Sequence, residues 1–219
     1  MDRMDKDGSR QEAREARIRE LEARISQRPA VGVRPWVAVV AILGGALLLG
    51  LNAQETAYFF SPREPLVLGT EGDYRFGQLA SNRYAQLHGV PTLRGVYARE
   101  GDEVFVIVGL RDTPVLVRRH ALPTEEWKPG QVPPQPDQRS FRVGGRLLSE
   151  ADAPRFRDAF AKLKEWGEVR PQDGKLWLLD EGRRPGEDRG ILVVDGLLLT
   201  FMAVNAYLLV RGLRARRRA

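Results

Sequence analysis

Two apolar runs of membrane-spanning length constrain the possible folds of this chain more than any other feature of its sequence. Residues 35–54 carry no charge, and residues 191–210 carry only Asp195. At 1.5 Å per residue, a helix of that length covers about 30 Å, the thickness of a bilayer's hydrocarbon core. The sequence therefore predicts two transmembrane helices, at 35–54 and 191–210, with the lipid bilayer as a partner.

Charge predicts the orientation of both helices. Residues 1–34 hold 9 basic and 7 acidic side chains, residues 211–219 hold 5 and none, and the segment between the two runs holds 21 of each. Because Lys and Arg are enriched on the cytoplasmic side of a membrane, we expect both termini to be cytoplasmic and the central segment extracytoplasmic. Arginine outnumbers lysine 30 to 5, which is typical of a GC-rich genome, and we expect a multi-pass protein of a bacterial inner membrane.

Each run has a competing interpretation. The first resembles a signal peptide, but 34 residues rich in acids precede it and Leu51-Asn52-Ala53 is a poor cleavage site. The second could be the core helix of a soluble domain. Its arginine-rich end favours a membrane span, and Asp195 lies only about one turn inside the predicted outer boundary, where a carboxylate is tolerated.

The ends of the two apolar runs and the turn signals between them divide the chain into seven predicted segments. They are a charged cytoplasmic helix within 1–34, the first span at 35–54, a linker at 55–83, a β-rich domain at 84–181, a linker at 182–190, the second span at 191–210, and a basic tail at 211–219.

Turn signals divide the central domain into strands. Residues 84–98 predict one long strand interrupted at Gly89 and Pro91, followed by strands in 104–109 and 114–119 that form a meander. A proline-rich excursion at 120–140 leads to further strands at 140–149 and 175–182. About five strands and one helix predict an OB-like domain or, alternatively, an irregular α+β sheet.

The single predicted helix of this domain covers residues 150–166. Ser149 precedes it with Asp152 three positions later, the spacing of a capping box, and Gly167 follows as a stop. Phe156, Phe160 and Leu163 share one face and predict its buried side.

Catalytic motifs are missing from the sequence. It contains no cysteine, which excludes disulfides and thiolate metal sites, and it lacks a nucleophile elbow, a phosphate-binding loop and a His-Glu-x-x-His helix. The neutral central domain and its compartment argue against nucleic acid as a partner. We expect a non-enzymatic protein without a cofactor.

Two histidines offer an alternative function. His88 lies on the first predicted strand and His120 at the end of the third. If those strands were neighbours, the two imidazoles could begin a haem or metal site. We otherwise expect both to be structural.

Polar residues inside the predicted spans offer another alternative. Asp195 could contact Asn52 or Gln54 of the first span and serve a transport or proton-relay assembly, or it could simply start its helix at the interface. The residues predicted to anchor the spans at the membrane surfaces are Trp36, Tyr58, Phe59, Phe60, Arg211 and Arg214.

One resemblance bears on function. The layout of span, outer β-rich domain and second span resembles the Surfeit-locus type of cytochrome oxidase assembly protein, and "VLVRRHALP" at 115–123 and "FRVGGRLL" at 141–148 are similar to successive strands of that family. The chain departs from the family in lacking a histidine at the head of the second span and a Trp-Gln signature after the first. The resemblance implies an assembly factor. We therefore expect an accessory or assembly component that has a membrane-protein partner or forms a homo-oligomer.

Overall fold

The computed structural model describes residues 17–18 and 35–218. Within that part the chain divides into two compact units, one made of residues 35–50 and 195–218 and the other of residues 51–194. The predicted cytoplasmic helix within 1–34 lies almost wholly outside the described residues.

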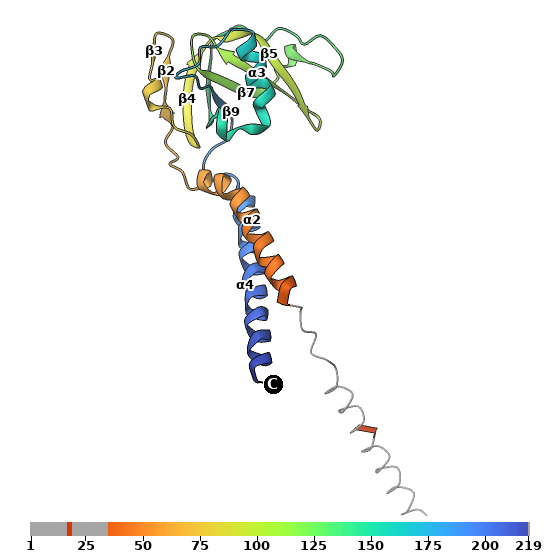
Figure 1. Cartoon of the computed structure of the whole chain (residues 1–219). Coiled ribbons are helices and arrows are strands. Elements are labelled where there is room, and N and C mark those ends of the chain that lie inside the picture. The colour runs from red at the N-terminus through yellow and green to blue at the C-terminus, as the bar shows by residue number, and fades with distance from the viewer. Residues whose placement is uncertain (1–16, 19–34, 219) are drawn as a thin grey trace, which may run out of the picture. The chain divides into compact units, whose positions relative to one another are not determined.

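Two long apolar helices flank the central domain in the chain. Helix α2 covers Pro35–Phe59 and helix α4 covers Arg189–Arg218 (Figure 1). Both are long and apolar enough to cross a membrane, as judged by length and composition. Helix α4 continues through most of the predicted basic tail, so Arg211 and Arg214 lie on the same helix as the apolar run.

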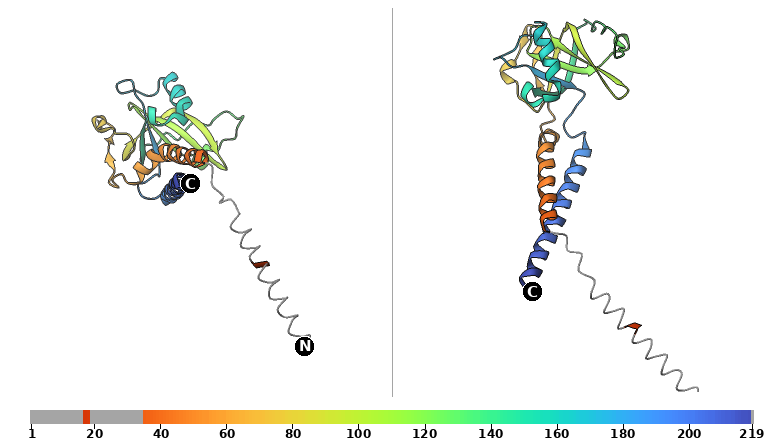
Figure 2. Two further views of the ribbon diagram at one scale, coloured as in Figure 1. Left: turned by 60° about the horizontal axis from the view of Figure 1, so that its bottom comes forward. Right: turned by 45° about the vertical axis from the view of Figure 1, so that its right-hand side comes forward.

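The two helices contact each other within the first unit. They lie side by side in the right-hand view of Figure 2, and a Cβ atom at Gly45 would lie 2.6 Å from Cγ of Met202 and 2.9 Å from its Sδ. Glycine therefore permits the observed contact, because a side chain at this position would have to displace Met202.

The central domain is built on a seven-stranded mixed sheet. In chain order its strands are β1 (Leu66–Val67), β4 (Arg83–Gly89), β5 (Pro91–Glu100), β6 (Glu103–Leu110), β7 (Val115–His120), β8 (Phe141–Ser149) and β9 (Trp177–Glu181). Their order across the sheet is β1-β4-β8-β9-β7-β6-β5. Pairing is antiparallel except for β1 with β4 and β7 with β9.

The predicted long strand at 84–98 is two strands that do not pair with each other. Strand β4 pairs with β8, whereas β5 pairs with β6, and the break between them lies between Gly89 and Pro91. A proline has no N–H for a ladder, and it restricts the residue before it, so the strand breaks where these residues stand. The predicted meander survives as β5-β6-β7.

The predicted linker at 55–83 contains regular structure. Besides β1 it holds a small hairpin of β2 (Gly69–Thr70) and β3 (Asp73–Tyr74) and a 3₁₀ turn, η1 (Phe76–Gln78). Leu68, between β1 and β2, is fully buried in the core of the domain. This segment therefore belongs to the folded domain.

Two apolar clusters form the core. One gathers around Leu87, Val106, Val117, Leu147 and Leu179. The other lies where helix α3 (Arg157–Glu165) covers the sheet, with Phe160 and Leu163 fully buried against side chains that include Leu116 and Leu178 (Figure 1). The burial of these two helix residues confirms the predicted apolar face.

Helix α3 begins later than predicted. The Ser149 hydroxyl accepts a hydrogen bond from the Asp152 backbone N–H, as expected of a cap, but the cap leads into two 3₁₀ turns, η3 (Glu150–Asp152) and η4 (Pro154–Phe156). Pro154 disfavours helical geometry at the residue before it, so the α-helix starts only at Arg157. Gly167 ends it with φ of +69°, as predicted.

The strand order leaves β1 and β5 as the two edges of the sheet. The structure thus shows a mixed β-sheet domain with one covering helix between two apolar helices. It does not confirm the OB-like closure.

Candidate functional site

A buried arginine joins the end of α2 to the sheet. Arg146, on β8, is 2% exposed, and its Nη1 lies 2.6 Å from Oε2 of Glu55 on α2. Its Nε donates to Oδ1 of Asn82 at 2.9 Å and its Nη2 to the carbonyl of Gln54 at 3.2 Å. A buried guanidinium is tolerated only when its donors are satisfied in this way.

Tyr58 completes the contact between α2 and β8. The Arg146 guanidinium carbon lies 4.7 Å from the centre of the Tyr58 ring, a cation–π arrangement. The Tyr58 hydroxyl donates to the carbonyl of Arg183 at 2.7 Å. Tyr58 is only 5% exposed, so it packs within the domain, whereas Phe60 is 70% exposed in the same aromatic cluster.

Ion pairs extend from this point across the sheet. Arg183 contacts both Glu55, at 3.1 Å, and Asp180 of β9, at 3.5 Å. Asp180 in turn accepts from Arg118 of β7 at 2.7 Å, and Arg118 also reaches Glu100 at the end of β5. We call Glu55, Arg146, Arg183, Asp180, Arg118 and Glu100 the junction network. It links α2 to four strands of the sheet.

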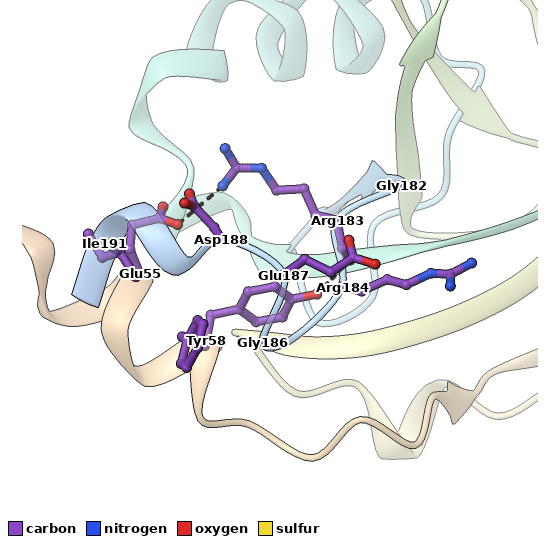
Figure 3. A pocket seen from close by; sticks show the side chains of 10 residues that line it. Glu55, Tyr58, Gly182, Arg183, Arg184, Gly186, Glu187, Asp188 and Ile191 are labelled. Carbon is purple, nitrogen blue, oxygen red and sulfur yellow. Dashed lines mark hydrogen bonds and ion pairs between the residues drawn. The ribbon is translucent and has the colours of Figure 1, made fainter. Parts of the chain in front are cut away.

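A cleft of about 170 Å³ opens beside the junction network. Figure 3 shows Glu55 and Arg183 joined across it, with the Tyr58 ring below and Glu187 and Asp188 from the loop before α4. Its lining mixes both signs of charge with apolar side chains, and one of its two arginines, Arg183, is already paired with Glu55 and Asp180. The cleft therefore belongs to a structural junction between helix ends and the domain.

A second buried ion pair fixes the proline-rich segment. Glu125, 1% exposed and within η2 (Pro123–Glu125), accepts two hydrogen bonds of 2.7 Å from Arg119 of β7. It also accepts from the backbone N–H groups of Leu122 and Asp137. One carboxylate thus ties the start and the end of the excursion to the sheet.

The environment of Glu125 determines its charge. Burial alone would raise its pKa, but the hydrogen bonds from Arg119, Leu122 and Asp137 outweigh that effect and lower the pKa below its ordinary value. By contrast, burial raises the pKa of the neighbouring Tyr97 to about 12. Both groups therefore keep one charge state at neutral pH.

The two histidines do not lie on neighbouring strands. His88 is on β4, opposite Arg142 of β8, and His120 is at the end of β7, beside Phe105. Strands β8 and β9 lie between β4 and β7. The adjacency required by the haem or metal alternative is thus missing, and the described residues contain no cluster of three side chains suited to a metal ion.

The polar residues of the spans have local partners. The Gln54 carbonyl accepts hydrogen bonds from Asn82 and Arg146, so it belongs to the junction. Asn52 and Asp195 are each partly buried on their helices, and each makes an interaction. Trp36, at the start of α2, is 61% exposed, and Phe59 packs edge-on against Phe60.

Sequence reasoning missed the residues of the ion pairs that buried arginines make, Arg146–Glu55, Arg118–Asp180 and Arg119–Glu125. One signal was present: Arg146 stands between Gly145 and Leu147 in an apolar strand, and Arg118 and Arg119 follow three apolar residues of β7. A charge within an apolar strand indicates a buried partner, but the sequence does not show which acid supplies it.

Comparison with known proteins adds no assignment, because no family model, curated protein or solved structure matches this chain significantly. The resemblance to the Surfeit-locus type of assembly protein remains a prediction.

Proposed function

We propose that this chain is a two-span protein of a bacterial inner membrane. Both termini would lie in the cytoplasm, and the β domain would act outside as an accessory or assembly component of a membrane complex. The apolar surfaces of α2 and α4 support this proposal most directly. Leu47 is 65% exposed, Leu51 70%, Leu197 66% and Tyr207 63%, although the core of the β domain is complete without them.

Energetics favour a bilayer around these helices. Exposing one large apolar side chain to water costs roughly 1.5–3 kcal/mol relative to burying it. More than a dozen such side chains are exposed along α2 and α4. The total greatly exceeds the stability of a typical domain, about 5–15 kcal/mol, so these surfaces need a lipid or protein environment.

The junction network supports an accessory role. Its charged groups are paired with one another, and Arg146 of β8 has partners on α2 and in the turn before β4. Paired, desolvated groups with fixed charges hold structural elements in position and are poorly suited to transferring protons. A sheet tied rigidly to the last turns of α2 suits presentation of a surface to a partner.

The orientation can be tested by labelling single cysteines, because the chain has none of its own. Asp102→Cys lies in the exposed turn between β5 and β6. Ser9→Cys and Ala219→Cys report on the two ends. In intact spheroplasts, a membrane-impermeant maleimide should label Asp102→Cys alone, and all three after the membrane is opened. Labelling of either end before opening would overturn the proposed orientation.

The accessory role is tested separately, by purifying the tagged full-length protein in mild detergent from its own membranes. We expect a defined membrane complex to co-purify, and we expect its assembled amount to fall in a deletion strain. Turnover of a substrate by the purified protein, abolished by one polar substitution, would replace this proposal with an enzymatic one.

A further inference from the structure

The sheet contains an unfilled position beyond the end of β9. Strand β9 lies between β7 and β8, but it ends at Glu181, whereas β7 continues to His120 and β8 begins at Phe141. Gly182, with φ of +79°, turns the chain out of the sheet, and its N–H donates to the carbonyl of Gly144. We call the space between His120 and residues 141–143 the β9 slot.

Backbone groups of β8 face this slot. Along a strand, residues point their N–H and C=O groups alternately to one side and the other. The carbonyl of Gly144 points to the β9 side, and that of Leu147 points to the β4 side, where it accepts from Asn82. Arg142 therefore directs its N–H and C=O into the slot, where no strand of the described chain pairs with it.

An open cavity occupies the same place. It measures about 490 Å³, and its lining includes His120, Leu122, Arg139, Phe141, Arg142 and Glu181. From Gly144 to Phe141 the unpaired edge is three residues long, or roughly 10 Å at 3.3 Å per residue. The space thus accepts a short extended segment in line with β9.

The charge of the slot changes along its length. Glu181 stands at the end where β9 stops. Toward the open end Arg139 is paired with Asp137 at 2.6 Å, which leaves Arg142 as the cation there. The Arg142 side chain is exposed and has no hydrogen bond or ion pair to any described residue. Phe141 and Leu122 add apolar walls. The open end therefore suits a carboxylate beside an apolar side chain.

We infer that the β9 slot binds an extended acidic segment of a partner protein, which adds to the sheet as a short strand between β7 and β8. The backbone of Arg142 would pair with the segment's main chain, and its guanidinium would bind a carboxylate of that segment. This inference adds to the proposed function the chemical class of the segment that the partner protein presents. It rests on the proposed function for one point, that a partner protein exists.

Labelled peptides test this inference on the full-length protein in lipid nanodiscs, with empty nanodiscs as blank. The probes are the hexapeptide TVEVEV, its amide analogue TVQVQV, and TVEVEV with N-methylated backbone amides. Fluorescence anisotropy should show saturable binding of TVEVEV, weakened about tenfold or more by either change, since each removes charged or main-chain hydrogen bonds.

Matched variants locate the site. Arg142→Gln should weaken TVEVEV binding about tenfold, the loss expected for a charge-assisted hydrogen bond. Arg170→Gln is the matched control. Arg170 is exposed, is paired with Asp112 and does not line the slot, so this substitution should leave binding unchanged. Equal binding of TVEVEV and TVQVQV, an unaffected Arg142→Gln variant, or no saturable binding would each overturn the inference. The cysteine-labelling result is independent of these outcomes, so failure of the slot and failure of the topology are distinguishable.

Discussion

At the scale of single residues, three buried arginines carry most of the domain's unusual electrostatics. Arg146, Arg119 and Arg118 are 2%, 7% and 8% exposed, and each has a carboxylate within 2.7 Å. Such pairs add little net stability compared with apolar residues of equal size, but removing one partner leaves an uncompensated buried charge. The penalty for separating them is what keeps α2 and the proline-rich segment in position.

Glu55→Leu should destabilise the domain by about 1–3 kcal/mol, because it leaves the buried Arg146 with only neutral acceptors and its ring contact, while Glu55 itself is 43% exposed. Thermal unfolding in detergent, followed by circular dichroism, measures the change. Glu64→Leu is the control, since Glu64 is exposed in the following loop. Equal melting of the two variants would contradict a central role for the Glu55–Arg146 pair.

Glu125 should make stability depend on pH. Its pKa is lowered in the folded state, so its contribution is fully present above the ordinary value of 4.5 and is lost as pH falls through the lower folded-state value. Glu125→Gln should therefore be less stable at pH 7 and lose less on acidification. Urea unfolding at several pH values measures this, with the exposed neighbour Glu126→Gln as control. Parallel pH curves for wild type and Glu125→Gln would refute this assignment.

At the scale of elements, local pattern predicted most strands but not their neighbours. Strands β6 to β9 correspond to the apolar segments and turn signals of the sequence, and the Ser149 cap and Gly167 stop stand where expected. The predicted interruption at Gly89 and Pro91 is where β4 ends and β5 begins, but the pattern fitted a bulge or a barrel corner and did not show that the two parts pair with different strands. Pairing of β4 with β8 joins distant segments, which periodicity does not encode.

The same limit explains the incomplete prediction of the candidate site. An acid at the end of an apolar run, such as Glu55, indicates a helix end at an interface. Its pairing with Arg146 depends on the fold bringing β8 to that helix end. The positions of the two histidines were missed for the converse reason, since the sequence supplied the residues but not the two strands that lie between them in the sheet.

Gly45→Ile should weaken the contact between α2 and α4, because its side chain would meet Met202 where a Cβ alone would come within 2.6 Å. Gly44→Ile is the matched control, since a Cβ there meets nothing within 4 Å. Fluorescence energy transfer between labels on the two helices, measured in nanodiscs, should fall only in the Gly45 variant. A fall of equal size in both variants would contradict the contact.

At the scale of the whole molecule, the boundary of the domain does not coincide with the boundary of the apolar runs. The compact unit that holds the sheet extends over residues 51–194, and so includes the last two turns of α2. Those turns supply Glu55 and Tyr58, the partners of Arg146. The domain is therefore complete only with part of each helix attached.

A pair of soluble fragments tests this boundary. Fragment 51–194 should fold with a higher melting temperature than fragment 61–188, which leaves Arg146 buried without Glu55 or Tyr58. Adding Arg146→Met to the shorter fragment should restore part of the loss, since it removes the unpaired charge. If both fragments melt alike, or if Arg146→Met does not help the shorter one, the junction contributes nothing to the stability of the domain.

The position of β9 has a consequence for the order of folding. It is the last strand in the chain and the middle strand of the sheet, with β1, β4 and β8 on one side and β5, β6 and β7 on the other. Until residue 181 is available, these two groups of strands have no shared partner, and the edges of β7 and β8 stay unpaired. We therefore expect the edges of β7 and β8 to be paired late during synthesis, when the chain has nearly reached α4, because a five-residue strand at the end of the domain supplies their shared partner.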